Sequence, residues 1–157
     1  MPALKIEPDD PRRDDIQDLL TSHMSLMQDS SPPEHIHALD TNGLLAPNVS
    51  FYSLREDGLL LGVGALKELE PVHGEIKSMH TRIDQRGRGL GRMLLDYLLA
   101  TARSRGYRRV SLETGTMEQF AAARALYMSA GFEVCEPFAQ YWDNEYSVCM
   151  TLQLEPT

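Results

Sequence analysis

Hydrophobic residues along this chain follow two spacings, one of three to four residues and one of two, which are typical of amphipathic helices and half-buried strands. The strongest helical run places Leu90, Leu94 and Leu98 on one face. Near the end of the chain Val148 and Met150 begin a strand-like alternation instead. The pattern predicts helices over 11–28, 90–103 and 116–130, and strands over 49–55, 59–69, 75–83, 109–114, 132–137 and 147–154.

Turn and cap residues set the boundaries of these elements. Asp57-Gly58 is a hairpin signal between two strands, and His73-Gly74 indicates a second turn before the next strand. Gly106 is typical of a helix C-terminus. Residues 116–119 have capping-box spacing, which predicts a helix start. Residues 34–42 form either a short helix or an ordered loop.

The order of the elements indicates the α/β class. Two strand–helix–strand units in the second half imply parallel strand pairing, whereas the hairpin before them is antiparallel, so we expect one mixed sheet. We expect residues 1–157 to form a single domain, which buries about two thirds of its unfolded surface.

Composition narrows the class of protein. No run reaches the roughly 18 apolar residues of a membrane helix, and the first residues lack a signal-peptide pattern. We therefore expect a cytoplasmic protein without a membrane partner. Cys135 and Cys149 show no CxxC spacing, which favours buried reduced thiols.

Charge is spread unevenly over the chain. The net charge is −8, but residues 82–109 carry eight arginines against two acidic residues, so this span is +6 and the remainder is −14. An acidic body disfavours nucleic-acid binding. A local basic patch still suits a small phosphorylated ligand.

That patch begins with the glycine-rich run Arg86-Gly87-Arg88-Gly89-Leu90-Gly91-Arg92, which stands between a predicted strand and a predicted helix. Free N–H groups at the start of a helix, with arginines beside them, form a socket for phosphate or pyrophosphate. A P-loop would need Lys-Ser/Thr after the last glycine, where this chain has Arg92-Met93. The dinucleotide fingerprint would need G-x-G-x-x-G after the first strand, which is also missing.

The spacing R-x-x-G-x-G over 86–91 resembles the signature of the GNAT superfamily of acyl-CoA-dependent N-acyltransferases. Residues 125–132, ALYMSAGF, resemble the A-L-Y-x-x-x-G-F segment of the same family. A narrower resemblance, to a bacterial subgroup of small GNAT proteins without a defined substrate, is carried by 31–34, 37–40, 75–79 and 113–117. Two positions depart from the family pattern, because Phe120 replaces a common asparagine and Ile83 a common proline.

The resemblance implies the GNAT fold, a mixed and mostly antiparallel sheet of six to seven strands with one splayed parallel pair and flanking helices. It implies acetyl-CoA as cosubstrate, with its pyrophosphate on the backbone of Arg86, Gly87, Arg88, Gly89, Leu90, Gly91 and Arg92. The pantetheine arm would lie between strands 75–83 and 109–114. There it would face the main chain of Met79, His80 and Thr81, and one of these N–H groups could polarise the thioester carbonyl.

The resemblance also assigns catalytic residues. Tyr127 holds the family's tyrosine position and is the candidate acid for the departing thiolate, although the residues alone favour a core aromatic. Glu75 is the candidate base, and a solvated carboxylate at a strand start is the alternative. His80 is a weaker candidate base.

Acceptor-binding residues are expected in three places. His37 and Asp40 would help line the pocket, and Glu113 is a further candidate. Tyr141 and Trp142 would border it or simply shield it from solvent. His35 and His37 could pair on a metal, but no further ligand follows, so we expect no metal.

Together these features predict an N-acetyltransferase that moves an acetyl group from acetyl-CoA to a primary amine of a small molecule, directly within a ternary complex. A protein or peptide amine as acceptor, and a non-catalytic acyl-CoA-binding module, stay open as alternatives. The resemblance also leaves a homodimer open.

Overall fold

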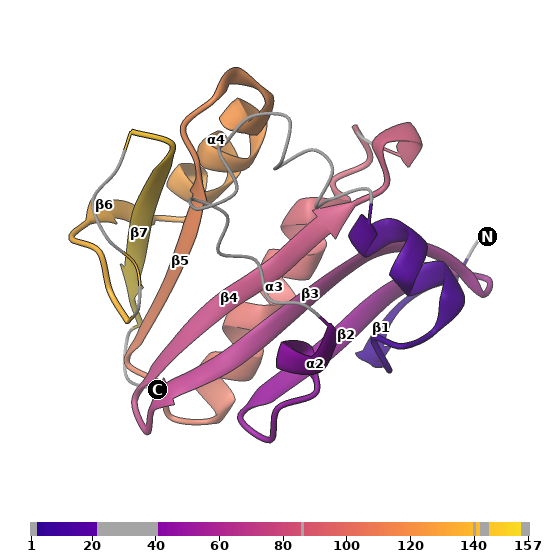
Figure 1. Cartoon of the computed structure of the whole chain (residues 1–157), viewed down its shortest axis with the longest axis horizontal. Helices are drawn as coiled ribbons and strands as arrows, with labels where there is room; N and C mark the ends of the chain where they lie inside the picture. Colours follow the sequence, from indigo (N-terminus) through magenta and orange to yellow (C-terminus); the bar gives the residue numbers. More distant parts are fainter. Residues whose placement is uncertain (1–2, 22–40, 86, 140, 142–144, 155–157) are drawn as a thin grey trace.

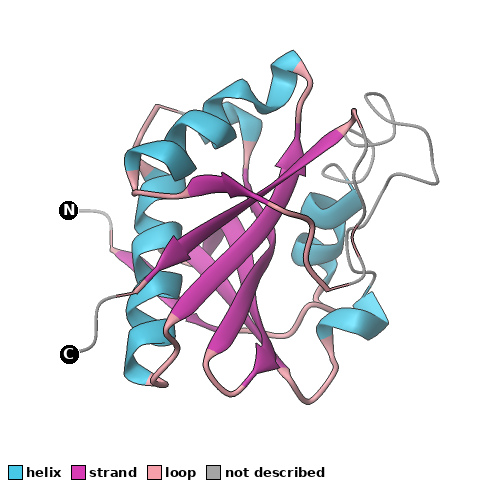
Figure 2. Cartoon of the chain, turned by 90° about the vertical axis from the view of Figure 1, so that its left-hand side faces the viewer, coloured by secondary structure: helices cyan, strands magenta, loops and turns pink. Residues whose placement is uncertain are grey.

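The structure, a computed structural model, describes residues 3–21, 41–85, 87–139, 141 and 145–154. These residues form a seven-stranded sheet with helices on both faces (Figures 1 and 2). The strands are β1 (Leu4–Pro8), β2 (Val49–Glu56), β3 (Leu59–Glu70), β4 (His73–Thr81), β5 (Arg109–Gly115), β6 (Glu133–Cys135) and β7 (Ser147–Gln153). The helices are residues 14–21, α2 (Thr41–Leu44), α3 (Leu90–Ser104) and α4 (Ala121–Ser129), with 3-10 turns at Ile83–Gln85 and Glu118–Phe120.

The strand order is β1-β2-β3-β4-β5-β7-β6, and only β4 and β5 pair in parallel. The expected mixed sheet with one parallel pair is therefore confirmed. Parallel pairing was also expected for the second strand–helix–strand unit, and that prediction is wrong. β7 lies between β5 and β6, so β6 runs in the direction of β5 without pairing with it.

One face of the sheet, the α3 face, is covered by α3 (Figure 2). Apolar residues at helical spacing on α3, such as Leu95 and Leu98, pack into a core with Leu66, Ile76 and Leu112 from the strands. Full burial of one such side chain stabilises the fold by roughly 1.5–3 kcal/mol. The helix thereby holds its first residues beside the end of β4.

The opposite face, the α2 face, is covered by α2 and by helical residues 14–21 (Figure 1). Ile16 and Leu19 of helix 14–21 pack against Phe51 and Val63. Successive side chains of a strand point to opposite faces of the sheet, so the strand neighbours of Phe51 and Val63 point toward the α3 face. This helix lies within the predicted segment 11–28.

A bulge in β4 changes which face its side chains occupy. Val63 pairs with His80, but Ala65 pairs with Lys77, so β4 carries one extra residue at this point. Ser78 has a φ of 54°, in the left-handed region that residues with a Cβ rarely adopt. His80 consequently lies on the α2 face with Lys77, instead of on the α3 face.

The predicted turn at His73-Gly74 is wrong, because both residues belong to β4 and the chain turns at residues 71–72. Gly74 serves a close approach instead of a turn. A Cβ on it would lie 2.8 Å from the ring of Tyr107. β4 also ends at Thr81, two residues before the predicted end.

The predicted capping box at 116–119 does not form. The Thr116 hydroxyl donates to the Glu145 carbonyl (2.6 Å), a 3-10 turn intervenes, and α4 begins only at Ala121. The ring of Phe120 packs on the end of β5, where a Cβ on Gly115 would lie 2.2 Å from it. β6 is shorter than the predicted 132–137, and β1 was not predicted.

Arg55 ties the start of the chain to the sheet. Its side chain is 9% exposed and donates to the carboxylate of Asp9 (3.2 Å), which is 7% exposed, and to that of Asp15 (2.6 Å). Burial acts to raise the pKa of Asp9, but hydrogen bonds from Ser53, the Asp10 amide and Arg55 lower it overall. The hydrogen bond from Arg55 lowers the pKa of Asp15.

Replacing Arg55 should therefore destabilise the fold in a pH-dependent way. Arg55→Met leaves a buried carboxylate without its cation, and we expect the free energy of unfolding at pH 7 to fall by about 3 kcal/mol. Because both carboxyl pKa values are lower in the folded chain, this stabilisation is present above about pH 4 and disappears as the pH falls through the folded values. Urea unfolding at pH 7 and pH 3 measures the difference.

The matched control is Arg13→Met, because the side chain of Arg13 is 56% exposed and its guanidinium lies 3.4 Å from the carboxylate of the same Asp9. An exposed pair of this kind contributes less than about 1 kcal/mol. Equal losses for the Arg55 and Arg13 variants would contradict the account of this network.

Candidate active site

The parallel strands β4 and β5 separate halfway along their length (Figure 1). They pair only from His73 to Ile76 and from Arg109 to Leu112. β4 continues to Thr81 and β5 to Gly115, beyond the last pair. The facing N–H and C=O groups of these extensions have no partner strand in this sheet, so an extended ligand could hydrogen-bond there like an added strand.

The glycine loop lies at the carboxyl end of β4 and leads into α3. Gly87 and Gly89 have φ values of 88° and 77°, which glycine adopts without strain. α3 begins at Leu90. The first N–H groups of a helix have no partner within the helix, and here no capping side chain binds them. A Cβ on Gly91 would lie 3.2 Å from Leu126, which brings the start of α3 close to α4.

Arg88 and Arg92, the arginines of the loop that the structure describes, already have partners. Arg88 forms an ion pair with Glu56 (2.5 Å), at the end of β2. Arg92 forms one with Asp96 (3.0 Å) and also donates to the Ser129 hydroxyl (3.3 Å) on α4. Exposed pairs are worth roughly 0–1 kcal/mol, so a phosphate could replace either carboxylate at low cost.

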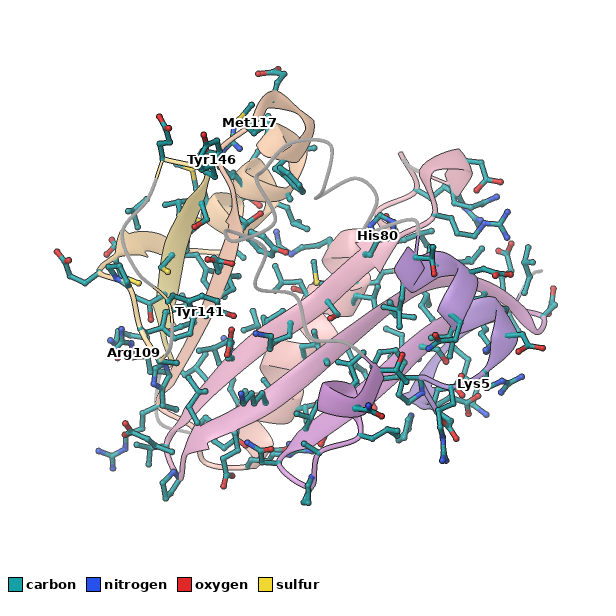
Figure 3. All side chains as sticks on the ribbon, viewed as in Figure 1. Lys5, His80, Arg109, Met117, Tyr141 and Tyr146 are labelled. Carbon is teal, nitrogen blue, oxygen red and sulfur yellow. The ribbon has the colours of Figure 1, made fainter. Side chains whose placement is uncertain are left out.

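A polar cluster lies on the α2 face beside the point where the strands separate. Lys77 Nζ lies 3.2 Å from Oε2 of Glu75 and 2.5 Å from the hydroxyl of Tyr141, and that hydroxyl donates to the same Oε2. All three residues are buried, with Glu75 only 1% exposed. Tyr141 (Figure 3) reaches the cluster from the connection between β6 and β7.

Burial lowers the pKa of Lys77, and the negative charge of Glu75 opposes this effect. Burial, with the neighbouring charge of Glu75, raises the pKa of Tyr141. Tyr141 therefore stays a hydroxyl donor throughout the neutral pH range.

The other predicted residues of β4 and β5 lie around this cluster. Glu113 lies on β5, one residue beyond the last pair with β4, and its charge acts on Lys77. His80 is buried on the α2 face near the end of β4 (Figure 3). Met79 packs toward α3, and Thr81 ends the strand.

Tyr127 lies on α4 in the core of the α3 face, where its ring packs edge-on against Phe132 with centroids 5.8 Å apart. Burial raises its pKa to about 12, so the phenol keeps its proton at neutral pH. Within the part of the chain that the structure describes, its hydroxyl has no hydrogen-bond partner.

Both cysteines are free thiols and are register partners on β6 and β7, but only Cys149 is buried as expected, whereas Cys135 is partly exposed. Burial raises the pKa of both, that of Cys149 to about 11. Thiols that stay protonated at pH 7 are poor nucleophiles.

Lys77 is the residue of this cluster to which the sequence analysis gave no role. Its signal is the alternation of Glu75, Ile76 and Lys77, which places two opposite charges on one face of a strand.

Several sequence-based assignments lie outside the described residues, namely Arg86, His35, His37, Asp40 and Trp142. Across 3–21, 41–85, 87–139, 141 and 145–154, three or more potential metal ligands do not gather at any one place. In the same ranges, every helix is too short or too polar to cross a membrane.

The open strand pair with a glycine loop at the start of a helix is the arrangement of acyl-CoA-dependent N-acyltransferases, and comparison with known proteins supports this class. The model of the acetyltransferase (GNAT) family matches residues 13–132. The chain therefore belongs to the GNAT family of acetyltransferases.

Named relatives agree with this family. The chain is 44% identical over 151 residues to the uncharacterized N-acetyltransferase YsnE of Bacillus subtilis, covering 96% of this chain and 100% of that protein. It is 43% identical over 149 residues to the uncharacterized N-acetyltransferase YedL of Escherichia coli, covering 95% and 94%. The crystal structure of a putative acyl-CoA N-acyltransferase from Klebsiella pneumoniae superposes with a TM-score of 0.78 at 28% identity, covering 97% and 98%.

Proposed function

We propose that this acetyltransferase moves an acetyl group from acetyl-CoA directly to a primary amine of a small molecule, with both substrates bound at once. The observation that carries the proposal is the separation of β4 from β5 after Ile76 and Leu112, beside a buried carboxylate.

The donor would enter the opening as an extra strand. The pantetheine arm contains two amides, which suit the main chain of Met79, His80 and Thr81 on β4, beyond the last pair with β5. One N–H group there would also polarise the thioester carbonyl and stabilise the oxyanion that forms on attack.

The pyrophosphate would lie on the loop from Arg86 to Arg92. Backbone N–H groups at the start of α3 and the positive end of its dipole attract an anion. Arg88 and Arg92 would exchange their present carboxylate partners for phosphate oxygens.

The acceptor amine must lose a proton before it attacks. An alkylammonium has a pKa near 10.4, so neutralising it at pH 7 costs about 4–5 kcal/mol unless the site assists. Glu75 would take this proton, because it is the buried carboxylate next to the opening.

The departing thiolate would be held by Tyr127, whose hydroxyl is protonated at neutral pH and has no partner in the described part of the chain. After the attack the nitrogen still carries one surplus proton, and this second proton completes the CoA thiol. Direct transfer is favoured over an acyl-enzyme route because Cys135 and Cys149 have raised pKa values.

A small acceptor is favoured because Tyr141 closes over Glu75 and Lys77 on the α2 face. Glu113 adds a negative charge beside them, which suits a cationic amine. His37 and Asp40 are proposed to complete the acceptor pocket.

The loop geometry makes a prediction about CoA affinity. Gly89→Ala forces a Cβ into the left-handed region at the start of α3, which costs about 1–2 kcal/mol. We expect the Kd for CoA, measured by calorimetry, to rise about tenfold as the loop relaxes. Gly106→Ala is the matched control, because Gly106 has a φ of 82° at the other end of the same helix. A similar rise in both variants, or in neither, would contradict the proposed phosphate site.

Tyr127→Phe should separate catalysis from binding. The ring stays in the core while the hydroxyl is lost, so we expect kcat to fall by about 10–100-fold, in the range of general acid effects. The Kd for CoA should stay within twofold. Parental turnover in this variant would remove Tyr127 from the mechanism.

The function itself is tested by thiol release from acetyl-CoA in the presence of panels of small amines and of peptides with free amines. We expect turnover with one or more small amines and none above background with the peptides. Turnover with peptides alone would favour a protein acceptor. Tight CoA binding without turnover on either panel would favour an acyl-CoA-binding module.

A further inference from the structure

The two oxygens of Glu75 have different surroundings. Oε2 receives hydrogen bonds from Lys77 Nζ (3.2 Å) and from the Tyr141 hydroxyl, which itself accepts from Lys77 (2.5 Å). Oε1 is buried and has no hydrogen-bond partner among the described residues. Oε2 of the carboxylate thus has two hydrogen-bond donors, whereas Oε1 has none among the described residues.

A bare buried oxygen is costly, since a buried acceptor without a donor loses roughly 1–3 kcal/mol, and more when it is charged. The fold nevertheless keeps Glu75 at 1% exposure, beside the opening between β4 and β5. A ligand that donates a hydrogen bond would satisfy this oxygen, and the acceptor ammonium is such a donor.

We propose that Lys77 and Tyr141 are positioning residues that hold Oε2 of Glu75 and leave Oε1 to take the proton from the acceptor ammonium. This inference rests on the proposed function. In the step, an N–H bond of the ammonium breaks, its electron pair stays on nitrogen, and an O–H bond forms on Oε1. A carboxylate and a cation become a carboxylic acid and a neutral amine, and the acid returns its proton to water after product release.

Each positioning residue has a distinct part. Lys77 supplies a positive charge 3.2 Å from Oε2, so that the buried carboxylate has a counter-ion. Tyr141 supplies an O–H donor, and its ring lies 5.0 Å from Lys77 Nζ. Because Tyr141 lies between β6 and β7 in the sequence, the orientation of Glu75 on β4 depends on a residue that is distant along the chain.

Other titratable groups lie near Glu75, and their effects must be distinguished from those of Lys77 and Tyr141. Lys67 is the register partner of Glu75 on β3, and the charge of Glu75 acts on His73 and on Cys149. Among the described residues, the titratable groups near this carboxylate are those of Lys67, His73, Lys77, Glu113, Tyr141 and Cys149.

The test is the pH dependence of kcat/KM for acetylation of the best amine from the panel, in Lys77→Met, Tyr141→Phe and the parent. Without the charge or the donor on Oε2 the carboxylate protonates more readily, so the acid limb should move to higher pH, by about one unit or more for Lys77→Met. Tyr141→Phe should move it in the same direction by a smaller amount and lower kcat about tenfold. KM for acetyl-CoA should stay within twofold in both variants.

Lys67→Met is the matched control, since it removes the same charge from the neighbouring strand without touching Oε2. Its acid limb should move clearly less than that of Lys77→Met, because Lys67 makes no hydrogen bond to Oε2. Calorimetry with CoA checks that each variant is folded, and if Lys77→Met does not fold, the isosteric Tyr141→Phe still decides.

Glu75→Gln tests the role of Glu75 as the base separately from the positioning roles of Lys77 and Tyr141. We expect its kcat to fall by about 10²–10⁴-fold. If Glu75→Gln is inactive but Tyr141→Phe keeps the parental profile, the positioning roles are wrong and the proposed base stands. If Glu75→Gln keeps the parental kcat, the base itself is wrong and the positioning proposal falls with it.

Discussion

The separation of β4 from β5 is the constraint on which the rest of the structure depends. Four residues of each strand pair in parallel, and beyond Ile76 and Leu112 the strands diverge. An open pair of this kind leaves the facing backbone groups without a partner strand, so their hydrogen bonds have to come from other groups, from water or from a ligand. α3 packs across the opposite side and keeps the strands attached to one core while they diverge. The same helix delivers the glycine loop to the open end.

The bulge at Ser78 and the burial of Glu75 give this opening two different sides. Toward α3 it is apolar, with Met79 and the core of Tyr127. Toward α2 it is polar, because the extra residue in β4 brings His80 to the side of Lys77. A thioester between the two sides would have an amine and its base on one side and the departing sulfur on the other. In the proposed mechanism, removal of the amine proton and stabilisation of the thiolate would therefore take place on different sides of the opening.

Features set by neighbouring residues were predicted from the sequence, whereas those set by distant contacts were not. Asp57-Gly58 and Gly106 mark real boundaries because their positive φ values are local requirements. The place of β7 between β5 and β6 depends on long-range pairing, which local spacing does not encode. Likewise Glu75 could be proposed as a base from its motif, but its contact with Tyr141 spans 66 positions along the chain. The roles of the site residues stay predictions.

The most direct measurement of the central claim is a crystal structure of the protein with acetyl-CoA. The account predicts that the pantetheine arm lies between β4 beyond Ile76 and β5 beyond Leu112, with the pyrophosphate at the first N–H groups of α3. Acetyl-CoA bound elsewhere, or β4 and β5 paired along their full length in the complex, would contradict it.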